Sequence, residues 1–294
     1  MNAVLRTNRI SPVAVQILKT KNISTENNQI EGEEITEHMQ IENDKIYNMD
    51  CLEGMKFIPD KSIDCIICDL PYGTTACSWD SVIPFDELWK HYDRIIKDNG
   101  AIILFGVEPF SSALRLSNIK WYKYDLIWKK SKSGSAFCAK YRPISKHENI
   151  SIFSRGKMKT TYNPQMIQGE PYKRTHKISE CDINNHKIGF NRKEIVSVND
   201  GFRYPDTILD FPQKWRRQDQ VHPTQKPVEL IEWLVRTYSN EGDIVLDNCI
   251  GSGTTAIACI NTNRHFIGFE LDTKYFDIAM NRINKLKHDN NSNK

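Results

Sequence analysis

The feature that most constrains the fold is a regular alternation of short apolar runs with amphipathic segments of helical spacing. Ile63–Ile67 is an apolar run typical of a buried strand. Phe85–Ile96 follows with apolar side chains at helical spacing, and Ala101–Phe105 is again strand-like. The order recurs near the end of the chain, where helical Val228–Tyr238 precedes the predicted buried strand Asp243–Leu246. This alternation predicts an α/β fold with a doubly wound, mostly parallel sheet.

The first of these strands ends in the turn Asp69-Leu70-Pro71-Tyr72. In open α/β sheets, ligands bind at the loops that follow the carboxyl ends of the strands. Pro71 restricts Leu70 to extended geometry, which leaves the Leu70 carbonyl free to point out of the turn. A carboxylate and a carbonyl can accept the two N–H bonds of an exocyclic amino group while the Tyr72 ring stacks on a planar ligand. A plain strand-ending turn is the alternative interpretation.

The chain has 294 residues, enough for one large α/β domain or two small ones. Its formal net charge of +3 says less about partners than the distribution of that charge along the chain. There is no apolar run long enough to span a bilayer, and the first residues lack the core of a signal peptide. We therefore expect a cytoplasmic protein without a membrane partner.

The eight cysteines show no spacing typical of a disulfide framework in a chain of this size. Cys65 and Cys68 have the C-x-x-C spacing of a metal or redox pair. They lie in an apolar strand, however, where a separation of three residues puts the side chains on opposite faces of the sheet. We therefore interpret both as small buried residues and predict no metal site.

The segment Asp247–Thr255 indicates a second ligand site. It joins a predicted strand to a predicted helix through Gly251 and Gly253, and glycine allows the backbone to approach a ligand closely. The segment has neither a full G-x-G-x-x-G pattern nor a G-K-[ST] triplet, and the second absence argues against a nucleotide triphosphatase. A structural glycine turn is the alternative interpretation.

Two acids border this glycine turn in the predicted fold. The strand Phe266–Phe269 ends at Glu270, which lies 17 residues beyond Gly253, near the spacing at which an acid meets ribose hydroxyls. Asp247 ends the preceding strand, where its carboxylate would repel a pyrophosphate but attract a positively charged group. The pattern therefore favours a nucleoside that carries an amino acid.

Residues 1–44 are predicted to form a flexible acidic arm. From Ser24 to Asp44 there are seven acids, few aromatic residues and no Lys or Arg. Such an arm could bind a partner or mimic the charge of nucleic acid, and a solvated tail is the alternative. Residues 289–294, rich in Asn, are predicted to be a second flexible tail.

Positive charge is concentrated between Lys120 and Thr160. The segment holds eleven Lys and Arg against two acids, a net of +9 in a chain of +3. Aromatic residues lie among them, a mixture that suits a phosphate backbone and unstacked bases. A solvated face over an aromatic core is the alternative. The residues here and further along the chain that we assign to nucleic-acid contact are Lys129, Lys130, Lys132, Lys140, Arg142, Arg216 and Arg217.

Hydrophobic periodicity fades over residues 161–220, which are polar and too numerous for an ordinary loop. We therefore predict a small inserted region with its own role. It divides the α/β domain into a first half at residues 45–160 and a second half at residues 221–288.

Four ordered motifs resemble those of the DNA amino-methyltransferases. Asp69–Tyr72 resembles their D-P-P-Y motif, and Asp247–Thr255 resembles their S-adenosylmethionine motif, D-P-F-x-G-S-G-T-T. His222–Pro227 resembles their H-P-T-x-K-P segment, and Asp50-Cys51 resembles the acid and small residue that flank the cofactor adenine. The match covers roughly Ile46–Leu286, and the catalytic motif precedes the cofactor motif, as in the beta class.

The resemblance implies the S-adenosylmethionine-dependent methyltransferase fold, with residues 161–220 as target-recognition region. It implies methyl transfer to N6 of an adenine flipped out of double-stranded DNA, since an Asp-initial motif favours adenine. Asp69 and the Leu70 carbonyl would hold the amino group, and Tyr72, after Pro71, would stack on the base. The methionine part of the cofactor would be held by Gly251, Gly253, Thr254 and Lys226. Glu270 would bind the ribose, and Asp50 and Cys51 would border the adenine. Asp247 is also assigned to cofactor binding.

Three departures from the family pattern bear on these expectations. Leu70 replaces the first Pro, which should be tolerated because its carbonyl makes the contact. Asn248-Cys249 replace Pro-Phe, so an aromatic wall of the cofactor pocket is missing or supplied elsewhere. The acidic arm has no counterpart in the family.

Two other functions stay open: a cytosine-N4 methyltransferase, which would use the same geometry, and a non-catalytic DNA-binding module with a decayed pocket. A restriction endonuclease partner and a homodimer are further hypotheses. The expected location is the bacterial cytoplasm, at the nucleoid, with the gene carried by a bacterium or a phage.

Overall fold

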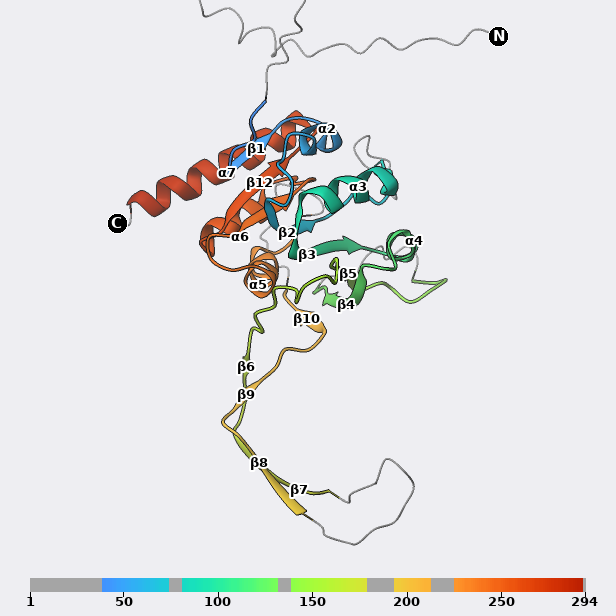
Figure 1. The fold of residues 1–294 in the computed structure, drawn as a ribbon, viewed down its shortest axis with the longest axis vertical. Helices are drawn as coiled ribbons and strands as arrows, with labels where there is room; N and C mark the ends of the chain where they lie inside the picture. Colours follow the sequence, from blue (N-terminus) through green and yellow to red (C-terminus); the bar gives the residue numbers. More distant parts are fainter. Residues whose placement is uncertain (1–38, 74–80, 132–138, 179–192, 213–224, 293–294) are drawn as a thin grey trace, which may run out of the picture. The chain divides into compact units, whose positions relative to one another are not determined.

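The computed structural model describes residues 39–73, 81–131, 139–178, 193–212 and 225–292, all within one unit, Met39–Lys294. These residues form one eight-stranded sheet and two short two-stranded ladders (Figure 1). β5 is antiparallel to both of its neighbours, and every other adjacent pair in the large sheet is parallel. The predicted doubly wound, mostly parallel sheet is thus confirmed. In spatial order the strands are β1 (Lys45–Tyr47), β12 (His265–Phe269), β11 (Ile244–Asp247), β2 (Ile63–Cys68), β3 (Ile96–Gly106), β5 (His147–Phe153), β4 (Tyr122–Lys129) and β10 (Ile208–Asp210).

Helices cover both faces of this sheet, so the domain has three layers (Figure 1). The helices α5, α6 and α7 contribute to the core on one face, and α2, α3 and α4 contribute to the core on the other. Their bounds are α2 (Cys51–Met55), α3 (Phe85–Ile95), α4 (Phe110–Ser117), α5 (Val228–Tyr238), α6 (Thr254–Asn261) and α7 (Thr273–Ser292).

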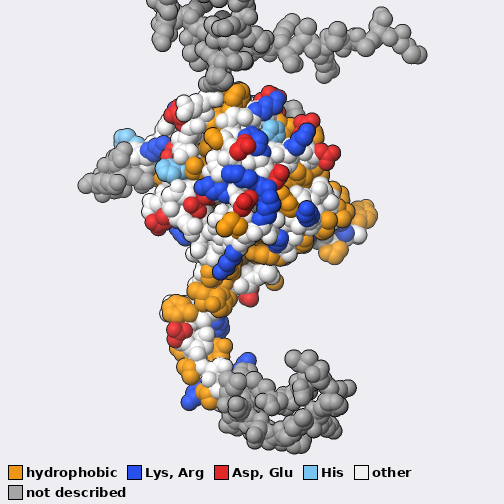
Figure 2. All heavy atoms as spheres, in the orientation of Figure 1, with side chains coloured by type: hydrophobic (Ala, Val, Ile, Leu, Met, Phe, Trp, Pro, Cys, Tyr) orange, Lys and Arg blue, Asp and Glu red, His pale blue; other side chains and the backbone are white. Residues whose placement is uncertain are grey.

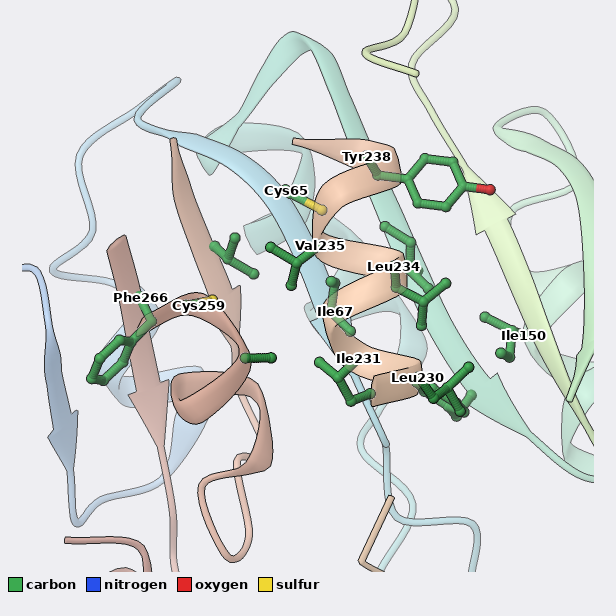
Figure 3. Close-up of a cluster of buried hydrophobic side chains, with 14 of the residues drawn as sticks. Cys65, Ile67, Ile150, Leu230, Ile231, Leu234, Val235, Tyr238, Cys259 and Phe266 are labelled. Carbon is green, nitrogen blue, oxygen red and sulfur yellow. The ribbon is translucent and has the colours of Figure 1, made fainter. Parts of the chain in front are cut away.

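The helix α5 lies at the centre of the first core (Figure 3). Its Leu230, Leu234 and Val235 are 0% exposed and pack in one cluster with strand residues such as Ile67 and Ile150. Spacings of four and five residues put these side chains on one side of a helix, which is why the sequence forms an amphipathic helix here. Burial of this apolar surface fixes α5, and with it the segment before α5, against the sheet.

Cys65 and Cys68 lie in different cores. Both are 0% exposed, Cys65 in the cluster beneath α5 and Cys68 in the cluster beneath α3. The prediction that a spacing of three residues puts them on opposite faces of a strand is confirmed.

Two elements are longer than predicted. β3 begins at Ile96, ahead of the predicted strand Ala101–Phe105, and a register shift opposite Ile63 and Cys65 accommodates Asp98-Asn99-Gly100. α7 continues to Ser292, into the predicted flexible tail, since this stretch has neither Pro nor Gly to end the helix.

The predicted inserted region, residues 161–220, contacts the rest of the domain near its start and again at β10 (Ile208–Asp210). At its start, the backbone N–H of Asn163 donates to the carbonyl of Thr237 on α5 at 2.7 Å. Near its end, β10 pairs in parallel with β4 and extends the main sheet. Three residues are too few to produce a periodic signal, so β10 was missed. The ladders between these points join β6 (Ile167–Gln168) to β9 (Phe202–Arg203) and β7 (Tyr172–Ile178) to β8 (Lys193–Asn199).

Some predictions fall outside the described residues. These concern residues 1–38 of the acidic arm, Lys132, Arg216, Arg217, and His222–Thr224 of the H-P-T-x-K-P segment. Among the helices that are described, none has both the length and the apolar character needed to cross a membrane.

Candidate active site

A pocket of about 370 Å³ opens at the sheet edge where β1, β2, β11 and β12 end. Asp50, Asp69, Asp247 and Glu270 lie at or within three residues of these strand ends, and all four line it. Parallel strands bring their carboxyl ends to a common edge, so residues distant in the sequence meet there. Other predicted site residues in the lining are Cys51, Leu70, Pro71, Tyr72, Lys226, Gly251 and Thr254.

Within the predicted catalytic turn, Asp69 and Tyr72 are bonded to each other. The Tyr72 hydroxyl donates to Oδ1 of Asp69 at 2.5 Å. The Tyr72 ring packs against Phe110 with centroids 5.0 Å apart, and the Leu70 side chain is 3% exposed in the core. The Asp69 side chain is 25% exposed, so a ligand in the pocket can reach its carboxylate.

Lys226 enters the pocket from the segment before α5 and pairs with two carboxylates. Its Nζ contacts Oδ2 of Asp69 and lies 3.2 Å from Oε2 of Glu148. The ammonium also lies 5.0 Å from the centroid of the Phe105 ring. On the far side, Nζ of Lys130 lies 2.9 Å from Oε1 of Glu148. The side chains of Lys226 and Glu148 are only 8% and 12% exposed, so this is a buried charge network.

The charges of this network follow from burial and from the neighbouring ions. Burial raises the pKa of Asp69; Lys226 opposes the rise and Glu148 adds to it. Burial also acts to raise the pKa of Glu148, but Lys226 and Lys130 outweigh it and hold that pKa below its ordinary value. Burial acts to lower the pKa of Lys226, yet Asp69 and Glu148 more than offset this effect and raise it. Lys226 and Glu148 are therefore ionised, and Asp69 takes up a proton most readily.

The two glycines of the cofactor motif have different surroundings. Both adopt left-handed backbone conformations, with φ of +53° at Gly251 and +80° at Gly253, which strain other residues. A Cβ at Gly251 would meet nothing closer than the Cys249 carbonyl at 4.0 Å, so its side of the turn is open. A Cβ at Gly253 would lie 3.0 Å from the Cβ of Ala279, so Gly253 serves the packing of α7.

Carboxylates flank the open glycine turn. Glu270 accepts hydrogen bonds from the backbone N–H of Gly251 at 2.9 Å and of Asp272 at 2.8 Å. Asp247 accepts from the Thr255 hydroxyl at 2.6 Å, and burial raises the pKa of Asp247 to about 7. A fixed acceptor beside an open turn suits ribose hydroxyls, and a buried acid suits a positively charged group. These residues fit a cationic nucleoside such as S-adenosylmethionine.

Asn248 and Cys249, which replace the Pro-Phe of the family motif, both line the pocket. Asn248 is 2% exposed, and its Oδ1 accepts from the Tyr92 hydroxyl at 2.6 Å. Its amide nitrogen lies 3.7 Å from Sγ of Cys51 and 3.6 Å from Sγ of Cys249. Aromatic lining comes from other parts of the chain, Phe269 among them.

Asp50 has a structural contact in addition to its place in the pocket. Its Oδ1 accepts from the backbone N–H of Leu52 at 2.8 Å and of Glu53 at 3.2 Å, which caps the N-terminus of α2. The cap places Cys51, the first residue of α2, in the pocket wall, where it is 8% exposed.

The residues assigned to nucleic-acid contact differ in their surroundings. Lys140 and Arg142 are exposed, in the stretch that leads to β5. Lys129 is exposed and pairs with Asp210 at 2.7 Å, whereas Lys130 is directed into the pocket network. Figure 2 shows Lys and Arg mixed with Asp and Glu on the visible face of the main body. Acids from other segments therefore offset part of the local positive charge.

Glu148 is a charged residue of the pocket that was not predicted from the sequence, where it is one of two acids in the basic segment Lys120–Thr160. It is the second residue of β5, opposite Trp128 near the end of β4. Because β5 is antiparallel, its start lies at the edge where the parallel strands end. The available signal was an acid near the start of a strand-like segment that contains the apolar residues Ile150, Ile152 and Phe153.

Comparison with known proteins identifies the family. Residues 63–281 match the DNA methylase family of N6 and N4 enzymes. The Type II methyltransferase M1.MboII of Moraxella bovis is 29% identical over 267 residues, covering 84% of this chain and 99% of that protein. The DNA adenine methyltransferase YhdJ of Escherichia coli (strain K12) is 27% identical over 261 residues, covering 83% of each.

Solved structures show the same fold. The crystal structure of the M1.HpyAVI–SAM complex matches with a TM-score of 0.56 at 24% identity, covering 82% of this chain and 98% of that one. The cytosine-N4-specific PvuII DNA methyltransferase matches with a TM-score of 0.57 at 15% identity, covering 82% and 86%.

The three-layer fold, with its mostly parallel sheet, is the fold of S-adenosylmethionine-dependent methyltransferases. Within that class, the chain belongs to the DNA methylase family and is a DNA amino-methyltransferase of the predicted beta class. Membership of this family, with the lining of the pocket, indicates S-adenosyl-L-methionine as the cofactor.

Proposed function

We propose that this protein methylates N6 of adenine at a specific sequence in double-stranded DNA. The observation that carries the proposal is the Asp69 carboxylate, reachable from the pocket and bonded to Tyr72 within one turn. An Asp-initial motif favours adenine in the resembled family. A relative of similar length is named a DNA adenine methyltransferase, which supports this choice.

The reaction requires the amino nitrogen to offer a lone pair that the purine ring normally withdraws. Asp69 and the Leu70 carbonyl accept its two N–H bonds, which favours a pyramidal nitrogen and orients the lone pair. The bound cofactor supplies a methyl group on a positively charged sulfur. Positioning of this kind contributes up to ~7–11 kcal/mol in favourable cases.

The target base must leave the DNA duplex before it can enter the pocket. Flipping costs a few kcal/mol, and stacking on Tyr72 would return about 1–3 kcal/mol of this. The Tyr72 ring is already held by Phe110 and by its bond to Asp69, so little side-chain order has to be created on binding.

The cofactor is assigned to the other side of the pocket. Gly251 and Thr254 provide an open turn, Glu270 accepts from ribose hydroxyls, and Asp247 faces the positive charge. Asp50 and Cys51 would border the adenine. Lys226 would reach the cofactor carboxylate only in competition with Asp69 and Glu148, with which it pairs here.

DNA contact is assigned to Lys129, Lys140 and Arg142 on the surface, and sequence recognition to the ladders of the inserted region. A restriction endonuclease partner, a homodimer and a cytoplasmic location at the nucleoid remain predictions. A digestion assay with the product of a neighbouring gene would test for the endonuclease. Analytical ultracentrifugation would test for the homodimer, and fluorescence microscopy would test the location.

Methylation of cytosine N4 is the second candidate, since the cytosine-N4-specific PvuII enzyme shares the fold. Incubating DNA with the protein and labelled cofactor, followed by digestion to nucleosides and mass spectrometry, decides between the two. N6-methyladenine is the expected product, and N4-methylcytosine would overturn the proposal. Calorimetry with S-adenosylmethionine tests the decayed-pocket alternative, which predicts no heat of binding.

A further inference from the structure

Glu148 lines the pocket without any role in the reaction as described so far. Its Oε1 is paired with Lys130, but its buried Oε2 accepts no hydrogen bond from the described residues. Oε2 lies 3.2 Å from Nζ of the Lys226 ammonium, and the two form an ion pair. Lys226 in turn contacts Asp69, so Glu148 is one ion away from the proposed acceptor of the target amino group.

We propose that Glu148 is a positioning residue for methyl transfer, which holds Lys226 between two carboxylates and so controls the orientation and charge of Asp69. This inference rests on the proposed function of Asp69 and adds to it a residue that does not touch the substrate.

Charge balance supports a single network. Two cations, Lys130 and Lys226, alternate with two anions, Glu148 and Asp69, and the four charges sum to zero. A buried ion costs several kcal/mol unless it is paired, so removing one member exposes its neighbour to that cost. The network therefore holds its members in one arrangement.

Geometry supports the same conclusion. Each Asp69 oxygen has its own partner, Tyr72 at Oδ1 and Lys226 at Oδ2, which fixes the plane of the carboxylate. The Lys226 ammonium is placed by Glu148 and by the face of the Phe105 ring. Without Glu148, only the face of the Phe105 ring in this set would still attract Lys226 away from Asp69.

The second carboxylate also changes how strongly Lys226 acts on Asp69. If Asp69 were the sole partner of a buried ammonium, it would be a poor acceptor for another N–H bond. Because Lys226 is shared with Glu148, the pKa of Asp69 is higher than it would be if Asp69 were the sole partner of Lys226. Within the described part of the chain, the other titratable groups that interact with Asp69 are Tyr72 from its own turn, Cys68 from β2 and Asp247 from β11, and none of the three supplies a positive charge.

The proposal predicts opposite effects for two variants. Glu148→Gln keeps the shape and removes the negative charge, so Lys226 should act on Asp69 alone and lower the pKa of Asp69. Lys226→Met removes the cation and should raise the pKa of Asp69. A neighbouring charge at this range shifts a pKa by about 1–3 pH units.

The test is a pH titration of full-length protein labelled with ¹³C at the aspartate carboxyl carbons. The Asp69 signal is identified by its absence in Asp69→Asn. Glu53→Gln is the matched control, because Glu53 is an exposed carboxylate paired with Lys56. We expect Asp69 to titrate lower in Glu148→Gln, higher in Lys226→Met and unchanged in Glu53→Gln.

The pH profile of kcat gives a second measurement. Its acidic limb should move to lower pH in Glu148→Gln, with kcat reduced on the order of tenfold. An unshifted Asp69 titration in Glu148→Gln would overturn the proposal, even if activity were lost. Shifted titrations in a protein that methylates no DNA would instead support the network and refute the proposed function.

Discussion

The Tyr72 hydroxyl donates a hydrogen bond to Oδ1 of Asp69 at 2.5 Å, so the acid and the aromatic ring of the catalytic turn hold each other in place. Phe110 supports the ring from behind, with ring centroids 5.0 Å apart. This arrangement separates two contributions of Tyr72, because its hydroxyl orients Asp69 while its ring is available for stacking.

Tyr72→Phe and Tyr72→Ala should distinguish these contributions. Loss of the hydroxyl removes one hydrogen bond of about 1–1.5 kcal/mol, so Tyr72→Phe should reduce the rate about tenfold. Tyr72→Ala also loses a stack worth about 1–3 kcal/mol and should be slower still. Single-turnover methylation at saturating DNA measures both rates. Equal rates for the two variants would argue against stacking.

Replacing Asp69 should separate catalysis from cofactor binding. Asp69→Ala removes the acceptor for the target amino group, so methylation should fall on the order of 10²–10³-fold or more. S-adenosylmethionine binding, measured by calorimetry, should stay nearly intact because Glu270 and the glycine turn are unaffected. Turnover at the wild-type rate would refute the role assigned to Asp69.

Asp247 should make cofactor binding depend on pH. Burial raises the pKa of Asp247 to about 7 from its ordinary value of 3.8, so below pH 7 the free protein holds a proton there. A cationic cofactor favours the ionised carboxylate, and its apparent Kd should therefore rise up to about tenfold per pH unit as the pH falls below 7. Calorimetry of cofactor binding at pH 6, in buffers of different ionisation enthalpy, should detect the proton that Asp247 releases on binding.

Asp247→Asn is the control for this linkage. The variant has no proton to release, so the pH dependence between about 4 and 7 should disappear along with the buffer dependence of the heat. A wild-type Kd that is flat across this range would contradict the prediction.

The packing of α5 should dominate the stability of the first core. Leu234 is 0% exposed in that core, so Leu234→Ala should lower the free energy of unfolding by about 2–5 kcal/mol. The matched control is Leu116→Ala, because Leu116 on α4 is 74% exposed. Its free energy of unfolding should change by less than about 0.5 kcal/mol. Urea unfolding followed by circular dichroism measures both, and similar effects in the two variants would contradict this account.

The exposed basic residues before β5 should contribute to DNA affinity without reading the sequence. Lys140→Gln with Arg142→Gln should reduce the slope of log affinity against log salt by about 1 for each DNA phosphate that the variant no longer neutralises. Lys285→Gln with Lys287→Gln removes two charges from α7 as a control. Fluorescence anisotropy across a salt series measures the slopes, and equal slopes in the two double variants would exclude this surface from DNA binding.

Much of the fold could be predicted because local patterns carry it. Ile63–Ile67 is apolar apart from Asp64, as expected of a strand largely buried on both faces, and helical spacing marks α5. The strand-ending acids Asp69 and Glu270 were predicted to belong to two ligand sites, and the structure places both in the lining of one pocket, since parallel strands end at a common edge. The short strand β10 and the full length of α7 were missed, because neither carries a distinctive local signal.

The sequence by itself determined the order of strands and helices, the catalytic turn and the glycine turn, because these depend on neighbouring residues and on backbone geometry. Only the tertiary structure decided that Lys226 pairs with Asp69 and Glu148. The reason is the reversed direction of β5, which brings the start of one strand to the carboxyl ends of the others. Ion pairing in a buried pocket depends on such distances in space, and sequence separation does not encode them.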